Sequence, residues 1–464
     1  LRPLIIGAAF AFLVFLAYQR GLLDTLELKS LDMRFQIRGT VSPQIPIVLV
    51  SIDQDSFDDL DLPWPWPRNL HAALIRKLAD SQAKVIAFDI LFTEPKADPQ
   101  EDRALAEAIR DAGNVILAAE YTEVPSDFGP RTSVNLPIPL IRKDALGYGP
   151  VNLITDRDGV VRRARQAILF QERIFPGFAY QIYQAIVGKE NLEGEEISLA
   201  PYLINFRGPA RSYPVVPYYR ILRDEIDPSF FHDKIILVGS FAKSLHDIFP
   251  TPFSASRPTP GVEIQANFVE TLVANDTIMP FHGWGYSVIF FFLATATIWI
   301  SFHFKPLRAV AVIALLAGFY AFACVYLFAE RQLWLPLVPT LLGIVLTYGG
   351  ITLDNYIREQ KERIRLRATF SKYVSADVVE ELLEDHEGLA LGGKRRHITV
   401  LFSDIRGFTS ISEQIGPEQV VLLLSDYFGQ VTHIVFKYGG TVDKFIGDAV
   451  FAIFGAPKSH GDDA

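Results

Sequence analysis

The distribution of apolar and polar positions divides this chain into segments of different kinds. Four apolar segments contain no charged residue, and they cover residues 3–19, 283–302, 309–329 and 333–353. The last three are each close to the about 20 residues that a helix needs to cross a bilayer. Soluble domains seldom bury helices that are so long and so uniformly apolar. The pattern therefore predicts four membrane-spanning helices.

The first apolar segment, residues 3–19, is short enough to be a signal peptide instead. No clear small-residue cleavage site follows it, which favours a retained anchor, and the missing initiator Met indicates a trimmed N-terminus. Basic residues lie in the connector 303–308 and at 358–367, after the last span. Such residues are expected on the cytoplasmic side. Four spans then place residues 21–281 outside the membrane and the C-terminal part inside.

Between the first and second spans, strand-like and helix-like patterns alternate. We predict strands at 46–52, 85–92, 115–119 and 234–238, and helices at 69–81 and 102–111. This alternation favours an α/β domain with a largely parallel sheet. Asp53 and Asp89 fall near the C-terminal ends of predicted strands, where such sheets bind ligands. For both, capping of a loop or helix is the favoured interpretation.

The C-terminal segment shows a strand, a helix and a hairpin. An apolar run at 400–403 ends at Asp404 and is followed by Gly407, which indicates a buried strand and a turn. Pro417 begins a helical pattern that ends at residues 439–440, and two β-rich runs flank Gly447 and Asp448. This order can bring Asp404 and Asp448 to one edge of a sheet. Paired carboxylates suit a divalent metal with phosphates, although Asp is also common in ordinary turns.

The region between the last span and this segment contains two candidate helices. Residues 354–367 alternate in charge and continue the last span; a solvated juxtamembrane helix is favoured over a coiled coil. A shorter amphipathic pattern covers residues 376–384. Residues 388–394 fit the start of a phosphate-binding loop, but Arg395 stands where Ser or Thr should hold the metal, so that interpretation is rejected.

Composition narrows the possible functions. The chain has 464 residues and a net charge of -9, with no basic stripe of the kind that nucleic-acid binding requires. Its length favours several domains. The single cysteine, Cys324, excludes an intramolecular disulfide and lies in an apolar segment, so we expect it to be a small buried side chain.

The residues around the two aspartates resemble the catalytic domain of the class III nucleotide cyclases. The resemblance rests on residues 402–409 and 444–449. It implies that Asp404 and Asp448 are catalytic residues that bind two Mg²⁺ or Mn²⁺ ions, with the backbone carbonyl of Ile405 as a further ligand. The family fold implies a partial α+β ferredoxin-like domain, the β-α-β-β portion, over residues 395–464.

The same resemblance implies how the substrate binds. The amides around Gly407, Phe408 and Thr409 would face the triphosphate, and Lys444 would read adenine where guanylate cyclases usually carry Glu. The implied reaction is attack of the ribose 3′-oxygen on the α-phosphate of ATP, which gives 3′,5′-cyclic AMP and pyrophosphate. Family sites form between two catalytic domains, so a homodimer is implied.

The family's remaining catalytic residues are expected beyond residue 464, so this chain is expected to be a truncated cyclase that is inactive by itself. Two alternatives stay open. One is a membrane sensor or dimerisation module without turnover, and the other is a guanylate cyclase, which Lys444 opposes.

The segment outside the membrane resembles the second class of CHASE-type sensory domains. The resembling residues are 64–68, 87–92, 158–163 and 260–267. The resemblance implies reception of an extracytoplasmic signal, with the ligand undefined. The predicted fold class is therefore a multidomain, multi-pass protein of the cell membrane. Its predicted parts are an anchor at 1–20, an α/β sensor at 21–281, three spans within 282–353, connector helices at 354–394 and the cyclase segment at 395–464.

Overall fold

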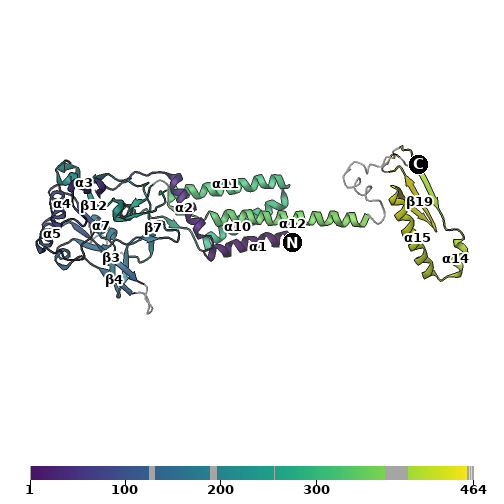
Figure 1. Ribbon diagram of the computed structural model, residues 1–464, viewed down its shortest axis with the longest axis horizontal. Coiled ribbons are helices and arrows are strands. Elements are labelled where there is room, and N and C mark those ends of the chain that lie inside the picture. Colours follow the sequence, from purple (N-terminus) through teal and green to yellow (C-terminus); the bar gives the residue numbers. More distant parts are fainter. Residues whose placement is uncertain are drawn as a thin grey trace. The chain divides into compact units, whose positions relative to one another are not determined.

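The computed structural model describes residues 2–124, 131–188, 196–254, 257–370, 395–456, 459 and 461 (Figure 1). Two compact units are present, Leu1–Ile351 and Thr352–Ala464. The predicted helix at 376–384 and the phosphate-loop-like sequence at 388–394 lie outside the described residues.

The first unit contains a seven-stranded sheet in the order β11-β1-β12-β2-β3-β4, with β5 also paired to β3. The strands are β1 (Ile47–Ile52), β2 (Val85–Leu91), β3 (Val115–Val124), β4 (Arg131–Asn135), β5 (Gly147–Pro150), β11 (Val215–Pro217) and β12 (Ile235–Ser240). All of these pairs are parallel except that of β3 with β4. The four predicted strands and the largely parallel sheet are confirmed.

Helices cover both faces of this sheet, which is why every residue of β1 and β12 is buried. The helices α4 (Arg68–Asp80) and α5 (Pro99–Ala112) contribute to the core on one face. The helices α2 (Asp24–Arg38), α7 (Phe178–Val187) and α9 (Gly261–Ala274) contribute to the core on the other. Both predicted helices are confirmed. The second begins earlier than expected because the side chain of Asp98 caps it.

Three of the four predicted spans are helices long and apolar enough to cross a membrane: α1 (Arg2–Gln19), α10 (Trp284–His303) and α11 (Pro306–Arg331). The fourth differs from the prediction. Its helix, α12 (Val338–Phe370), begins at Val338 rather than at residue 333. Leu333–Trp334 instead form the short strand β16, which pairs with β15 (Met279–Pro280). Backbone pairing therefore shortens the apolar part of this helix.

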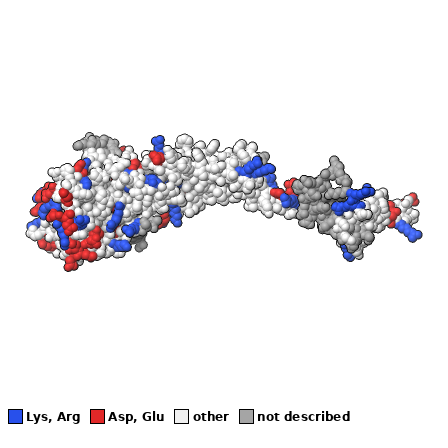
Figure 2. All heavy atoms as spheres, turned by 90° about the horizontal axis from the view of Figure 1, so that it is seen from above, with Lys and Arg blue, Asp and Glu red and all other residues white. Residues whose placement is uncertain are grey.

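The surface of these helices is apolar. Figure 2 shows charged side chains gathered over the sheet-containing part of the first unit and few over the helices. Phe292, Leu315 and Phe319 are each at least 70% exposed. A contiguous apolar surface of this kind is what a bilayer covers. Cys324 is fully buried in α11, as expected.

The helices approach one another closely at small residues. A Cβ atom at Gly350 of α12 would lie 2.4 Å from the ring of Phe10 in α1, and one at Gly343 would lie 2.9 Å from the ring of Phe290 in α10. Glycine at such positions lets membrane helices pack backbone against side chain. Helix α12 is therefore packed closely against α1 and α10.

Helix α2 joins the first span to the sheet-containing domain and also contacts the start of α12. The carboxylate of Glu27 accepts hydrogen bonds from the backbone N–H groups of Leu337 and Val338 and from the indole of Trp334. It also pairs with Arg34 at 3.0 Å, and both side chains are buried. Glu27 thus satisfies amide groups at the beginning of the last helix.

A second charged cluster joins α2 to the sheet-containing domain. The guanidinium of Arg162 on β7 (Val161–Arg165) pairs with Asp32 of α2 at 2.6 Å and with Asp156 and Asp158 at 2.9 and 2.8 Å. Arg162 is 1% exposed, so three carboxylates offset the cost of its burial. Asp158 and Arg162, two residues of the sensor resemblance, thus take part in a buried ion-pair cluster.

The second unit contains a three-stranded antiparallel sheet in the order β17-β19-β18. Its strands are β17 (Thr399–Ser403), β18 (Thr441–Ile446) and β19 (Ala449–Phe454). Helix α15 (Pro417–Lys437) packs on one face through a small core that includes Val435, Val442 and Val450. The predicted order of strand, helix and hairpin is confirmed, and a short helix α14 (Phe408–Gln414) was not predicted. The predicted juxtamembrane helix is also present, because α12 continues to Phe370.

Candidate active site

The two aspartates of the cyclase-like segment meet at one edge of the small sheet. Asp404 directly follows β17, and Asp448 lies in the turn between β18 and β19. Because Ser403 pairs with Val450, the end of β17 lies beside the start of β19. Gly447 adopts a left-handed φ of 63° in this turn, a conformation that favours glycine. The predicted juxtaposition of the two aspartates is confirmed.

The two carboxyl groups lie within hydrogen-bonding reach of each other. A side-chain hydrogen bond with Asp448, together with the negative charge of Asp448, raises the pKa of Asp404. Two carboxylate charges within hydrogen-bonding reach repel each other, and a cation bound between them relieves this repulsion. The pair is therefore suited to binding a positively charged ion.

The donor set fits a hard divalent cation. Carboxylate and backbone carbonyl oxygens are the ligands that Mg²⁺ and Mn²⁺ prefer. Within the residues that the structure describes, no group of three or more His, Cys, Asp or Glu side chains could hold a metal. Asp404 and Asp448 would therefore hold such ions together with the carbonyl of Ile405 and with oxygens from substrate or water, which Mg²⁺ commonly keeps.

The turn after Asp404 is closed by local hydrogen bonds. The Asp404 carboxylate accepts the N–H of Ile405 at 3.1 Å, and the Ile405 carbonyl accepts the N–H of Phe408 at 3.2 Å. Gly407 precedes α14 with a left-handed φ of 76°. The Phe408 amide thus already has a partner within the turn, whereas the expectation was that it faces phosphate together with the amides of Gly407 and Thr409.

Lys444 is exposed on the hairpin that carries Asp448. Its ammonium lies 3.1 Å from the carboxylate of Asp443 and 5.8 Å from the ring centroid of Phe451 on the neighbouring strand. Its side chain is 60% exposed, so the ion pair contributes little to stability. The lysine is therefore accessible to a ligand.

One polar contact at this edge was not predicted from the sequence. The hydroxyl groups of Ser403 and Tyr427 are 2.9 Å apart, which ties the end of β17 to helix α15 beside Asp404. Tyr427 fell within the predicted apolar face of the helix, and the pattern alone does not reveal that its hydroxyl reaches the strand. This contact helps to fix the position of Asp404.

Two family models match the two parts of the chain described above. The family described as CHASE2 domain matches residues 9–300. Because this match covers more than half of the sequence, the chain belongs to the CHASE2 domain family. The family described as adenylate and guanylate cyclase catalytic domain matches residues 393–464. Both resemblances stated from the sequence are confirmed.

Curated relatives are similar to the cyclase segment. Adenylate cyclase 1 of Rhizobium meliloti is 39% identical over 89 residues, which cover 19% of this chain and 13% of that protein. An uncharacterized protein of Mycobacterium tuberculosis is 39% identical over 106 residues, which cover 22% and 18% of the two chains. The chain thus spans less than a fifth of the length of these relatives.

Two solved structures match the same part of the chain. The adenylyl cyclase CyaB from P. aeruginosa is 48% identical, with 15% of this chain and 36% of that chain covered and a TM-score of 0.15. The guanylyl cyclase Cya2 is 49% identical, with 16% and 37% covered and a TM-score of 0.15.

Proposed function

We propose that this protein is a membrane-bound adenylate cyclase that converts ATP to 3′,5′-cyclic AMP and pyrophosphate under the control of its CHASE2 domain. The observation that carries the proposal is the meeting of Asp404 and Asp448 at one sheet edge, inside the segment that matches the cyclase family. The adenylate cyclase among the relatives supports the same reaction.

In this proposal each residue has a stated task. Asp404 and Asp448 hold two divalent ions with the Ile405 carbonyl, and they thereby position the triphosphate. When bound there, Mg²⁺ or Mn²⁺ would lower the pKa of the ribose 3′-hydroxyl and neutralise charge on the phosphates. Lys444, exposed on the hairpin, contacts the adenine ring.

We also propose a membrane topology and a dimer for this protein. Three helices long and apolar enough to cross a bilayer support a multi-pass membrane protein, with α12 as a further span and lipid as a partner. The CHASE2 domain would lie outside the membrane and the cyclase segment in the cytoplasm, where ATP is found. Two copies of the catalytic domain would pair to complete the sites.

The test measures cyclic AMP and cyclic GMP in membranes that carry the chain together with whatever follows residue 464 in its gene. Asp404→Asn and Asp448→Asn each remove a carboxylate charge at constant size, and we expect each to lower cyclic AMP formation by about 100-fold or more. The control is Asp426→Asn, because Asp426 is an exposed residue of α15 that accepts a hydrogen bond from Gln430 and lies outside the proposed site.

Expression and dimerisation should stay unchanged in all three variants. Wild-type rates in Asp404→Asn or Asp448→Asn would remove the site assignment. Formation of cyclic GMP alone would assign a guanylate cyclase, and no turnover of either nucleotide would assign a sensor without catalysis.

A further inference from the structure

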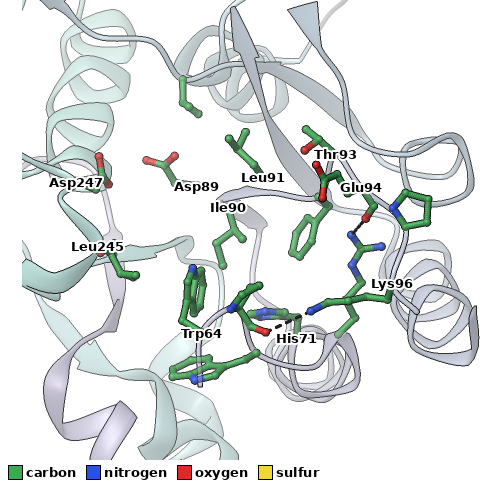
Figure 3. Close-up of a pocket in the computed structure, with 17 residues that line it drawn as sticks. Trp64, His71, Asp89, Ile90, Leu91, Thr93, Glu94, Lys96, Leu245 and Asp247 are labelled. Atoms are coloured by element: carbon green, nitrogen blue, oxygen red, sulfur yellow. Dashed lines mark hydrogen bonds between the residues drawn. The ribbon is translucent and has the colours of Figure 1, made fainter. Parts of the chain in front are cut away.

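A cavity of about 510 Å³ opens in the CHASE2 domain at the C-terminal ends of β2 and β12 (Figure 3). Open parallel sheets bind ligands at this end of their strands. The volume is in the range of sites for small organic molecules. Its position and size therefore fit a binding site for a small organic molecule.

Two carboxylates face each other across one end of this cavity. Asp89 comes from β2, and Asp247 lies between the short helix η3 (Lys243–Leu245) and the strand β13 (Ile248–Phe249) (Figure 3). Burial and the charge of Asp247 raise the pKa of Asp89, and burial raises the pKa of Asp247 to about 6. Among the described residues neither carboxylate has a cationic partner. Asp89 lies within β2 rather than at the start of a described helix, whereas Asp53 caps α3 (Gln54–Leu60), as expected.

An unpaired hydroxyl lies in the same cavity. Ser240 is the last residue of β12 and is 8% exposed, and its Oγ has no hydrogen-bond partner within the part of the chain that the structure describes. Buried hydroxyl groups are seldom left unpaired because the lost hydrogen bond to water is not replaced. Ser240 therefore offers a hydrogen bond to a molecule bound in the cavity.

The position of Asp247 is fixed by the start of helix α9. The Asp247 carbonyl accepts the N–H of Gly261 at 3.0 Å. A Cβ atom at Gly261 would lie 2.4 Å from the Asp247 carboxylate, so a larger residue there would displace this side chain. The backbone of Asp247 is thus held in place by the start of α9.

The cationic side chains that line the cavity are engaged elsewhere. Arg68 forms an ion pair with Asp102 and donates to the carbonyl of Glu94. Lys96 donates to the carbonyl of Pro65 at 3.3 Å and lies away from the acidic pair in Figure 3. The remaining basic lining group, His71, is kept neutral because burial lowers its pKa to about 3. The cationic side chains of the lining are therefore not paired with Asp89 or Asp247.

The rest of the lining decides which kind of cation fits. Trp64, Ile90, Leu91 and Leu245 give the cavity apolar walls. The two carboxylates and Ser240 lie beside these apolar walls, which favours an organic cation over a metal ion that keeps several waters. An ammonium group can be shared by two carboxylates, while its hydrocarbon part packs on an indole or aliphatic side chain.

We propose that this cavity binds a small organic amine, with the protonated nitrogen held between Asp89 and Asp247 and hydrogen-bonded to Ser240, and with the hydrocarbon part against Trp64 and Leu245. The CHASE2 domain of this chain is then a receptor for a primary amine or diamine. This inference concerns the sensor alone and holds whether or not the cyclase proposal does.

The experiment uses the full chain in lipid nanodiscs at pH 7.5. Binding of n-butylamine and 1,4-diaminobutane is measured by calorimetry and by the shift in unfolding temperature, beside n-butanol and butyrate. We expect saturable binding of both amines and none of the uncharged or anionic compounds. Asp89→Asn and Asp247→Asn should each weaken amine binding at least tenfold, and Ser240→Ala should weaken it severalfold.

The matched control is Asp53→Asn, which changes the carboxylate at the end of the neighbouring strand β1 while asparagine still caps α3. Its amine affinity should equal that of the wild type. The site variants should fold normally, because each removes a repulsive charge, and their unfolding temperatures verify this. Absence of amine binding, unchanged binding in the double variant Asp89→Asn/Asp247→Asn, or saturable binding of Ca²⁺ with the amines inert would each overturn the proposal.

Discussion

At the scale of the residue, the two aspartate pairs differ in their surroundings. Asp404 and Asp448 lie at an open sheet edge, where water and a substrate can reach them. Asp89 and Asp247 line a partly closed cavity in which burial makes ionisation unfavourable. The aspartate pair of the second unit is thus accessible to ligands. The pair of the first unit lowers the stability of the folded state when it ionises.

This penalty predicts how the stability of the CHASE2 domain depends on pH. Burial raises the pKa of Asp247 from 3.8 to about 6, so between these values the folded state binds more protons than the unfolded state. Asp247 should therefore make the free energy of unfolding fall as pH rises through this window, by at most about 3 kcal/mol. The raised pKa of Asp89 should continue the fall at higher pH.

Asp247→Asn should remove most of this fall and should be more stable than the wild type at pH 7. Unfolding followed by tryptophan fluorescence between pH 4 and 7 measures the effect, because Trp64 lines the cavity. A wild-type stability that rises across this window would contradict the prediction.

Lys444 gives a second prediction at the residue scale. If its exposed ammonium contacts adenine, Lys444→Glu should lower the ratio of ATP to GTP turnover by about tenfold or more. The assay compares both nucleotides in the same membranes, and Lys437→Glu, a lysine in the last turn of α15, is the control. An unchanged ratio in Lys444→Glu would exclude the adenine-reading role.

At the scale of the element, Glu27 connects α2 to the start of α12. Glu27→Ala leaves the N–H groups of Leu337 and Val338 without this acceptor and leaves Arg34 buried without its carboxylate. Removing one partner of a buried pair typically costs about 3–5 kcal/mol, whereas removing both costs much less.

We therefore expect Glu27→Ala to lower the unfolding temperature strongly and Glu27→Ala/Arg34→Met to recover part of the loss. Thermal unfolding in nanodiscs measures both. Equal unfolding temperatures for Glu27→Ala and the wild type would show that this contact does not hold α12 in place.

At the scale of the whole molecule, the arrangement of spans predicts which parts of the chain face each side of the membrane. Cys324 is buried and is the only cysteine, so single cysteines can be introduced without altering another thiol. Arg173→Cys in the CHASE2 domain should react with a membrane-impermeant maleimide on intact cells. Lys361→Cys, exposed on the distal part of α12, should react only after permeabilisation.

Labelling of both positions on intact cells would contradict the proposed topology. Labelling of neither, even after permeabilisation, would mean that the two side chains are covered in the membrane-bound protein. The wild type, with Cys324 alone, is the control and should stay unlabelled.

Sequence pattern determined the features that depend on local interactions. Apolar runs gave β1, β2 and β12 nearly to the residue, and Pro417 and the glycines at 439–440 marked the bounds of α15, because strands and helices follow periodicity and backbone preference. The two cyclase motifs also gave the meeting of Asp404 and Asp448, since a strand and a hairpin in one small sheet leave few ways to pair.

Tertiary structure alone decided the features that depend on residues far apart in the chain. Asp89 and Asp247 look like ordinary loop aspartates until β2 and the start of α9 bring them to one cavity. The pairing of β15 with β16 moves the start of α12, and Glu27 reaches backbone amides some three hundred residues away. Hydrophobic periodicity reports which face of an element is buried, but not which distant side chain is buried against it.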